Sequence, residues 1–279
     1  MFRSRFFCVF GCMLLVLCSC TKTAEAKSKN QTEEKENPAV LAHKSKVDAV
    51  VSKMSPRFLA KYQITDSNMD QFIKDLQEVL EEEKTFRKDD KSLFFLIDKK
   101  NKAESTYIPK DLIELKANEY FNLNKAGMKI RPEAYEALKV MGLAAQKDGI
   151  KLLVSSVYRS YEYQDNLFNY WVSVDGLEEA ERESARPGTS QHQLGTAVDF
   201  GSISDDFDQT TMGRWMYEHA ADYGWSLSFP KGYEDVTGYR WECWHFRYIG
   251  KKACQLQRKY FGDVQQFMLE FINEWKKTN

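Results

Sequence analysis

Residues 184–201 read SARPGTSQHQLGTAVDFG and place His192 seven positions before Asp199. Residues 241–245 read WECWH and add a second histidine, His245, close to a second carboxylate. Two imidazoles and one carboxylate are the usual protein ligands of a catalytic zinc ion, which keeps one coordination position open for water. The remaining carboxylate is then free to act as a base. The two stretches together predict a zinc-dependent hydrolase.

The alternation of residues 194–201 predicts a β-strand with two different faces. Asp199 falls on a face whose other members are small, which leaves room for a metal and a substrate. His192 has the opposite parity, so we expect it on the loop before the strand. The core face is predicted to carry Leu194, Thr196, Val198 and Phe200, and the open face Gly195, Ala197, Asp199 and Gly201.

The simple alternation of side chains along a strand does not suit the second stretch, residues 241–245. It puts Glu242 on the opposite side from His245, yet a base has to reach the same cavity as the metal. We therefore expect either that the strand begins after Glu242 or that a bulge near Cys243 redirects the chain. Cys243 shares the nominal face of His245 and is a rival soft ligand.

Further candidates come from two loops. The predicted strand 150–157 runs into Arg159, whose guanidinium stays charged and offers a planar set of donors, so it could stabilise the oxyanion of the transition state. Ser160 is a plausible N-cap of the next helix. Ser190 could hydrogen-bond substrate or act as a local cap. Zinc lowers the pKa of water to about 7, and Glu242 would take the water proton as base and return it as acid.

The pattern of apolar residues predicts an α+β fold with a mainly antiparallel sheet and packed helices. In the helix after Ser160, the stripe formed by Tyr163, Leu167, Tyr170, Trp171 and Val174 is typical of a buried core. Helices are predicted over 131–149, 211–223 and 251 to the end, and strands over 92–98, 150–157, 225–229 and 240–249.

The N-terminus is typical of a targeting segment rather than of folded structure. Residues 1–19 predict a lipoprotein signal peptide, followed by Cys20 as the lipidated residue, because LCSC at 17–20 is similar to a lipobox. Residues 20–38 are polar and predict a flexible tether. Residues 39–91 predict a helical N-terminal segment, and residues 92–279 the catalytic domain. We expect an exported protein, lipid-anchored at the bacterial cell envelope, in the periplasm or at the cell surface.

Composition limits the remaining choices. The 279 residues carry a formal net charge of -1, which gives no electrostatic reason to expect nucleic acid as a partner. Two of the six cysteines, Cys243 and Cys254, lie in the catalytic region, and export makes a disulfide between them chemically possible. His43 and His219 lie in predicted helices without a neighbouring motif, so we interpret both as structural.

The motifs together resemble a known family. They are SxHxxGxAxD at 190–199, ExWH at 242–245 and YRS at 158–160. Their order and spacing resemble the D-alanyl-D-alanine carboxypeptidases of the VanY type, within a wider group of zinc peptidases that includes D-Ala-D-Ala dipeptidases and the Hedgehog signalling domain. The likeness covers about residues 93–250. It implies a Hedgehog/D-Ala-D-Ala-peptidase-like fold with the N-terminal helical extension outside it.

The resemblance also implies roles for individual residues. It implies His192, Asp199 and His245 as zinc ligands, Glu242 as catalytic base, Arg159 as transition-state stabiliser and Gln164 as a substrate-binding residue. Peptidoglycan peptides are the implied substrate, with release of the terminal D-alanine. Gln191 stands where many members have glutamate, and Cys243 where many have proline.

Two alternatives remain open. One is a peptidoglycan endopeptidase of the same chemistry, which would cut an internal bond or a cross-bridge. The other is a non-catalytic cell-wall-binding lipoprotein whose zinc is structural. An intact base such as Glu242 favours an enzyme, because a binding protein has no need of it. The oligomeric state has no signature in the sequence.

Overall fold

The computed structural model describes residues 38–86 and 91–278. All of these residues belong to one compact unit. The predicted signal peptide, the lipidation site and nearly all of the predicted tether lie outside the described residues and stay predictions. None of the helices that the structure describes is long and apolar enough to cross a lipid bilayer.

The described residues contain a five-stranded sheet with the order β2-β4-β5-β7-β6. β2 and β4 are parallel, while the other neighbours in the sheet are antiparallel. The predicted α+β fold with a mainly antiparallel sheet is therefore confirmed. The strands are β2 (Phe121–Leu123), β4 (Leu152–Ser156), β5 (Ala197–Phe200), β6 (Trp225–Leu227) and β7 (His245–Tyr248), and a separate pair joins β1 (Ile113–Glu114) to β3 (Lys129–Ile130).

The two faces of β5 and β7 have different surroundings, because side chains alternate along a strand. Val198, Phe200 and Phe246 belong to an apolar core that also contains residues of helices α4 and α6. Asp199 and His245 are paired across β5 and β7 and point to the other face. The helices beside the sheet are α4 (Pro132–Lys147), α5 (Tyr161–Glu183), α6 (Thr211–His219) and the short α7 (Glu234–Thr237), with 3-10 turns η1 (Gln191–Leu194), η2 (Phe207–Gln209) and η3 (Ala220–Tyr223).

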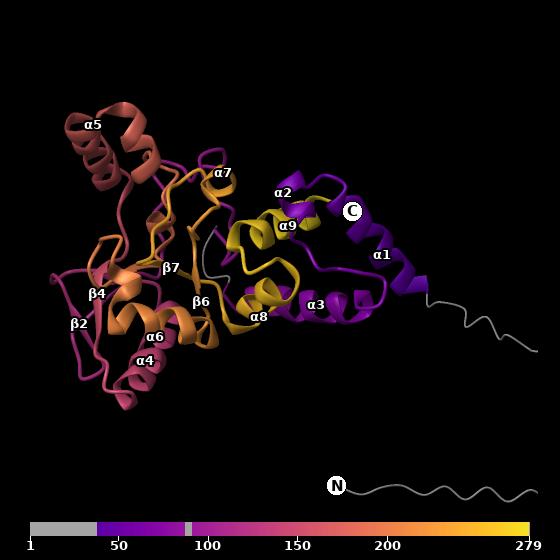
Figure 1. Cartoon of the computed structure of the whole chain (residues 1–279), viewed down its shortest axis with the longest axis horizontal. Helices are drawn as coiled ribbons and strands as arrows, with labels where there is room; N and C mark the ends of the chain where they lie inside the picture. Colours follow the sequence, from indigo (N-terminus) through magenta and orange to yellow (C-terminus); the bar gives the residue numbers. More distant parts are fainter. Residues whose placement is uncertain (1–37, 87–90, 279) are drawn as a thin grey trace, which may run out of the picture. The chain divides into compact units, whose positions relative to one another are not determined.

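Helices from both ends of the chain share a second apolar core. Phe58, Phe72 and Phe271 are fully buried in it, and the Phe271 ring contacts both of the others. The sequence predicts the N-terminal helices but not their packing against the C-terminal ones, which Figure 1 shows gathered in one group. These helices are α1 (Pro38–Val51), α2 (Pro56–Leu59), α3 (Met69–Thr85), α8 (Lys251–Tyr260) and α9 (Gln265–Lys277).

The predicted strand over 92–98 is wrong. Residues 92–98 form turns rather than a strand. The carbonyls of Leu93 and Phe95 each accept a hydrogen bond of 2.9 Å from the Arg247 guanidinium, so a side chain satisfies the backbone groups that a neighbouring strand would otherwise satisfy. The predicted helix after Ser160 is present and bends at Gly176, whose φ of 82° lies in the left-handed region.

Candidate metal centre and active site

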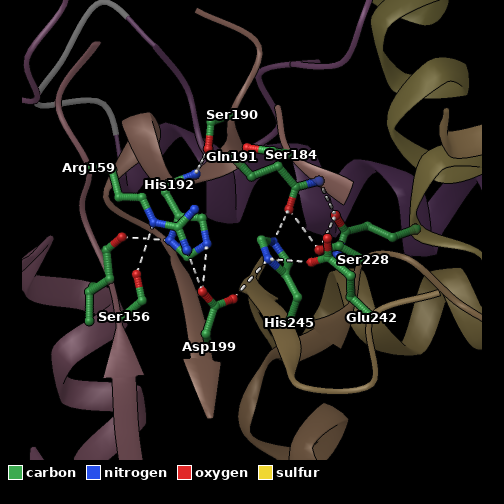
Figure 2. A network of polar contacts seen from close by, with 12 residues as sticks. Ser156, Arg159, Ser184, Ser190, Gln191, His192, Asp199, Ser228, Glu242 and His245 are labelled. Carbon is green, nitrogen blue, oxygen red and sulfur yellow. Dashed lines mark hydrogen bonds and ion pairs between the residues drawn. The ribbon is translucent and has the colours of Figure 1, made fainter. Parts of the chain in front are cut away.

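His192, Asp199 and His245 meet on the open face of the sheet, as Figure 2 shows. Asp199 lies on β5 directly opposite His245 on β7. His192 lies on η1, before β5, where strand parity predicts it. One donor atom from each residue lies within 4.8 Å of the other two, and all three residues are buried. The geometry is that of a cluster able to hold one metal ion.

Each imidazole presents one nitrogen to the cluster and uses the other elsewhere. His192 donates from Nδ1 to the Val157 carbonyl at 2.6 Å, which leaves Nε2 free, 3.2 Å from Asp199 Oδ2. His245 places Nδ1 3.0 Å from Asp199 Oδ1, while its Nε2 lies 3.2 Å from Gln191 Oε1. A hydrogen bond on the outer nitrogen fixes the orientation and tautomer of a metal-binding histidine.

The donor atoms of the cluster fit a zinc ion, both in their type and in their lack of other partners. His192 Nε2 and Asp199 Oδ1 are buried without a hydrogen bond of normal geometry among the described residues. A buried polar atom without such a partner is costly unless a ligand completes it. Two imidazole nitrogens and one carboxylate oxygen are the donor types that a catalytic zinc ion takes.

The electrostatics of the cluster favour metal binding. Burial and the charge of Arg159 lower the pKa of His192 to about 4, so its imidazole is neutral at neutral pH. Burial alone would raise the pKa of Asp199, but the neighbouring His192 and Arg159 outweigh it and hold that pKa well below the usual range. A neutral imidazole and an ionised carboxylate are the forms that bind a metal.

Glu242 lies beside the cluster in the turn that leads into β7. The strand begins at His245, so the expected irregularity is present and parity does not apply to Glu242. Its Oε2 lies 3.4 Å from His245 Nδ1, on the metal side of the ring. Burial and the charge of Asp199 raise the pKa of Glu242 to about 8. A carboxyl group with a pKa near neutrality is suited to accepting and returning a proton.

Arg159 reaches the cluster from the loop between β4 and α5. Its Nη2 donates to Asp199 Oδ2 at 2.6 Å, and its Nε donates to Ser156 Oγ at 3.0 Å. Nη1 donates to Gln164 Oε1 at 3.4 Å. The guanidinium is thereby fixed next to the ligands, where positive charge could stabilise an oxyanion. Its catalytic role stays a prediction.

The two predicted substrate-binding residues, Ser190 and Gln164, have different surroundings in the structure. Ser190 lines the pocket above the cluster, but its Oγ accepts a hydrogen bond from the His192 backbone and caps η1, as its alternative interpretation expected. Gln164 is 1% exposed and donates from Nε2 to the Ala185 carbonyl at 2.8 Å. In this geometry Gln164 supports Arg159, and its contact with substrate stays a prediction.

A pocket of about 390 Å³ opens over the cluster, and one of its walls is formed by α5. Tyr163 and Trp171 line this wall, together with Leu167. The predicted assignment of this stripe to a buried core is wrong, because Tyr163 and Tyr170 are 47% and 57% exposed. Helical periodicity alone does not distinguish a stripe that meets a core from one that borders a cleft.

Neither cysteine of the catalytic region takes part in the cluster. Cys243 and Cys254 are both free and buried. Cys243 belongs to the apolar core on the far face of the sheet, and its Sγ contacts the Ser204 carbonyl at 3.4 Å. His43 and His219 pack against Trp275 and Trp215, in keeping with the structural roles expected for them.

The residues that sequence reasoning missed do not belong to the cluster but contact the residues that surround it. Ser156 supports Arg159, and Ser228 donates to Gln191 Oε1 at 2.7 Å next to His245. Arg240 and Glu183 form an ion pair of 3.0 Å in the pocket wall. Serine and glutamine carry no distinctive spacing, so only the unusual Gln191 beside His192 gave a signal.

Comparison with known proteins places these residues in one family. The model of the VanY family, described as D-alanyl-D-alanine carboxypeptidase, matches residues 127–251, which include every residue of the proposed catalytic cluster. The Bacillus subtilis protein YodJ, named as a carboxypeptidase, is 36% identical over 192 residues, which cover 67% of this chain and 69% of that protein. A D-alanyl-D-alanine carboxypeptidase of Enterococcus faecalis is 34% identical over 119 residues, 39% of this chain and 44% of the relative.

A solved structure agrees with the sequence relatives. The LD-carboxypeptidase LdcB, whose structure was described for its recognition of peptidoglycan, superposes with a TM-score of 0.57 at 35% identity. The match covers 64% of this chain and 85% of LdcB. The predicted enzyme class, a zinc metallopeptidase, agrees with these relatives and with the donor set. The chain belongs to the VanY family of D-alanyl-D-alanine carboxypeptidases.

Proposed function

We propose that the protein is a zinc-dependent D,D-carboxypeptidase that releases the terminal D-alanine of peptidoglycan stem peptides. The observation that carries this proposal is the position of Glu242, whose carboxylate lies 3.4 Å from His245 Nδ1 in a pocket open to substrate. A metal that only stabilises a fold does not need a buried carboxyl group beside it. The predicted lipid on Cys20 would keep the enzyme outside the cytoplasmic membrane, together with its polymer substrate.

The residues of the site divide the work of hydrolysis. Glu242 is placed to take the proton of the attacking water and to return it to the amine of the leaving D-alanine. His192 and His245 are held at their outer ring nitrogens, so their inner nitrogens keep a fixed direction. A bound zinc ion supplies a Lewis acid that polarises the scissile carbonyl and lowers the pKa of water. Arg159 adds a fixed positive charge where negative charge develops.

Replacement of Arg159 by lysine tests that last role. Arg159→Lys keeps a positive charge but loses the planar fork that contacts Asp199, Ser156 and Gln164. We expect kcat to fall by about 10² to 10³, the usual effect of removing one oxyanion donor, while bound zinc is retained. Arg240→Lys is the matched control, because Arg240 lines the same pocket but pairs with Glu183 and Asp205. Equal losses in both variants would contradict a specific role for Arg159.

A substrate series tests the proposed reaction. The zinc-loaded protein is incubated with a pentapeptide stem that ends in D-Ala-D-Ala, and the products are identified by mass spectrometry. We expect free D-alanine and a tetrapeptide. Cleavage of an internal bond of this peptide, or of the bridge in a cross-linked stem dimer tested beside it, would instead support the endopeptidase. Binding to cell wall without any product, and unchanged after zinc removal, would support a non-catalytic protein.

A second candidate reaction is favoured by the similarity to LdcB. That protein is an LD-carboxypeptidase, and this chain covers 85% of it at 35% identity. The same series therefore includes a tetrapeptide stem, in which the terminal D-alanine follows an L-configured centre. Faster release from the tetrapeptide than from the pentapeptide would assign L,D- rather than D,D-specificity, with the same residues in the same roles.

A further inference from the structure

A line of buried hydrogen bonds joins His245 to the C-terminal helix. Gln191 Oε1 lies 3.2 Å from His245 Nε2 and also accepts from Ser228 Oγ, and Figure 2 shows these side chains together. Gln191 Nε2 donates to Gln265 Oε1 at 3.3 Å. Gln265 Nε2 in turn donates to the Ser226 carbonyl at 3.2 Å. Gln191, Ser226, Ser228 and Gln265 are all buried.

The orientation of each amide group in this line follows from the end that lies away from His245, the Ser226 carbonyl. A backbone carbonyl only accepts hydrogen bonds, so Ser226 requires the amide NH2 of Gln265. The Gln265 oxygen then faces Gln191 and requires the NH2 of that residue. The Gln191 oxygen consequently faces His245, so Nε2 of the ring has to carry the proton. Nδ1 of the ring faces Asp199 and Glu242, so a proton on Nε2 leaves Nδ1 able to offer its lone pair to a metal.

The hydroxyl of Ser228 does not impose this direction by itself. A serine hydroxyl rotates and both donates and accepts, so it satisfies either end of the Gln191 amide. Without Gln265, the Gln191 amide can turn its NH2 toward His245. That orientation favours the tautomer protonated on Nδ1, in which the nitrogen beside Asp199 has no lone pair for a metal.

We infer that Gln265 is a positioning residue for the metal centre, which acts through Gln191 to hold His245 in the Nε2-protonated tautomer. The inference rests on the proposed metal site and adds to it a residue outside the matched family region of 127–251. Gln265 is the first residue of α9, whose Phe267, Met268 and Phe271 are buried in the core shared with α1–α3. The helical core thereby keeps Gln265 in place, which gives the terminal helices a function in the site.

The test compares two neighbouring glutamines of α9. Gln265→Met removes the amide at similar side-chain length. Gln266→Met is the matched control, because Gln266 is also buried but bonds Asp98 and Glu270, away from the site. Nitrogen-15 NMR of the histidine rings in the full chain, with zinc and without it, reports which ring nitrogen carries the proton. Competition with a chromophoric chelator reports the affinity for zinc.

We expect Gln265→Met to move His245 toward the Nδ1-protonated tautomer and to weaken zinc binding by about 10- to 100-fold, the usual effect of losing an outer-shell partner. Gln266→Met should leave both quantities unchanged. An unchanged tautomer and zinc affinity in Gln265→Met, or equal changes in both variants, would overturn the inference.

A third variant separates the orientation of the Gln191 amide from the stability of the whole protein. Gln265→Glu keeps an oxygen that accepts from Gln191, so it should retain the wild-type tautomer even where its unfolding temperature falls. A shifted tautomer in Gln265→Glu would contradict the inference. The readouts need no substrate, so a protein that releases no D-alanine but shows these tautomers would refute the proposed reaction and leave this inference intact.

Discussion

Replacement of Glu242 by glutamine is expected to abolish most of the catalysis while leaving the metal in place. Glutamine has the shape of glutamate but cannot accept a proton, and Glu242 is the carboxyl group next to the cluster that no salt bridge to Lys or Arg occupies among the described residues. We expect kcat for D-alanine release to fall by about 10² to 10⁴, the usual contribution of a positioned general acid–base group. KM and zinc content should stay close to those of the wild type.

Glu183→Gln is the matched control for this prediction. Glu183 lines the same pocket and undergoes the same chemical substitution, but its carboxylate pairs with Arg240 instead of facing the ligands. A steady-state comparison of both variants with measured zinc content separates proton transfer from the general field of the pocket. Activity of Glu242→Gln within a few-fold of the wild type would refute the proposed mechanism.

The open face of the sheet could be predicted from the sequence because its determinants are local. Alternation over 194–201 is enough to put Val198 and Phe200 in the core and Asp199 on the other face. The requirement that Glu242 and His245 share a cavity predicted that strand parity would fail there, and β7 indeed begins at His245. These statements depend on a few neighbouring residues and on the chemistry of one metal.

Features that depend on distant partners could not be predicted in the same way. The stripe that contains Tyr163 and Trp171 has the period of a core-facing helix, but in the part of the chain that the structure describes these residues border the pocket instead. The hydrogen bond between Gln191 and Gln265 joins residues 74 positions apart, and no spacing rule connects two glutamines. Likewise, an apolar stripe on α9 predicts burial but not that α1 and α3 would cover it.

Removal of one predicted ligand is expected to have an effect as large as removal of the base, but through the metal. In His192→Ala, the imidazole donor of His192 is lost and two donors remain. Catalytic zinc sites have three protein ligands. Zinc supplies several kcal/mol of transition-state stabilisation, so we expect activity to fall by at least about 10³ and bound zinc to fall well below one per chain. Metal analysis of the purified variant, together with its D-alanine release, measures both losses.

Thermal unfolding makes this prediction independent of the assay. A metal that binds only the folded state raises the unfolding temperature by mass action, so a chelator should lower that temperature in the wild type. The same chelator should have no effect on His192→Ala, because no metal is left to remove. His219→Ala is the control, since His219 lies on α6 beside Trp215 and outside the cluster, and it should respond to the chelator as the wild type does. A His192→Ala protein that keeps its zinc and its response to chelator would exclude His192 as a ligand, because a site built on Asp199 and His245 alone would then suffice.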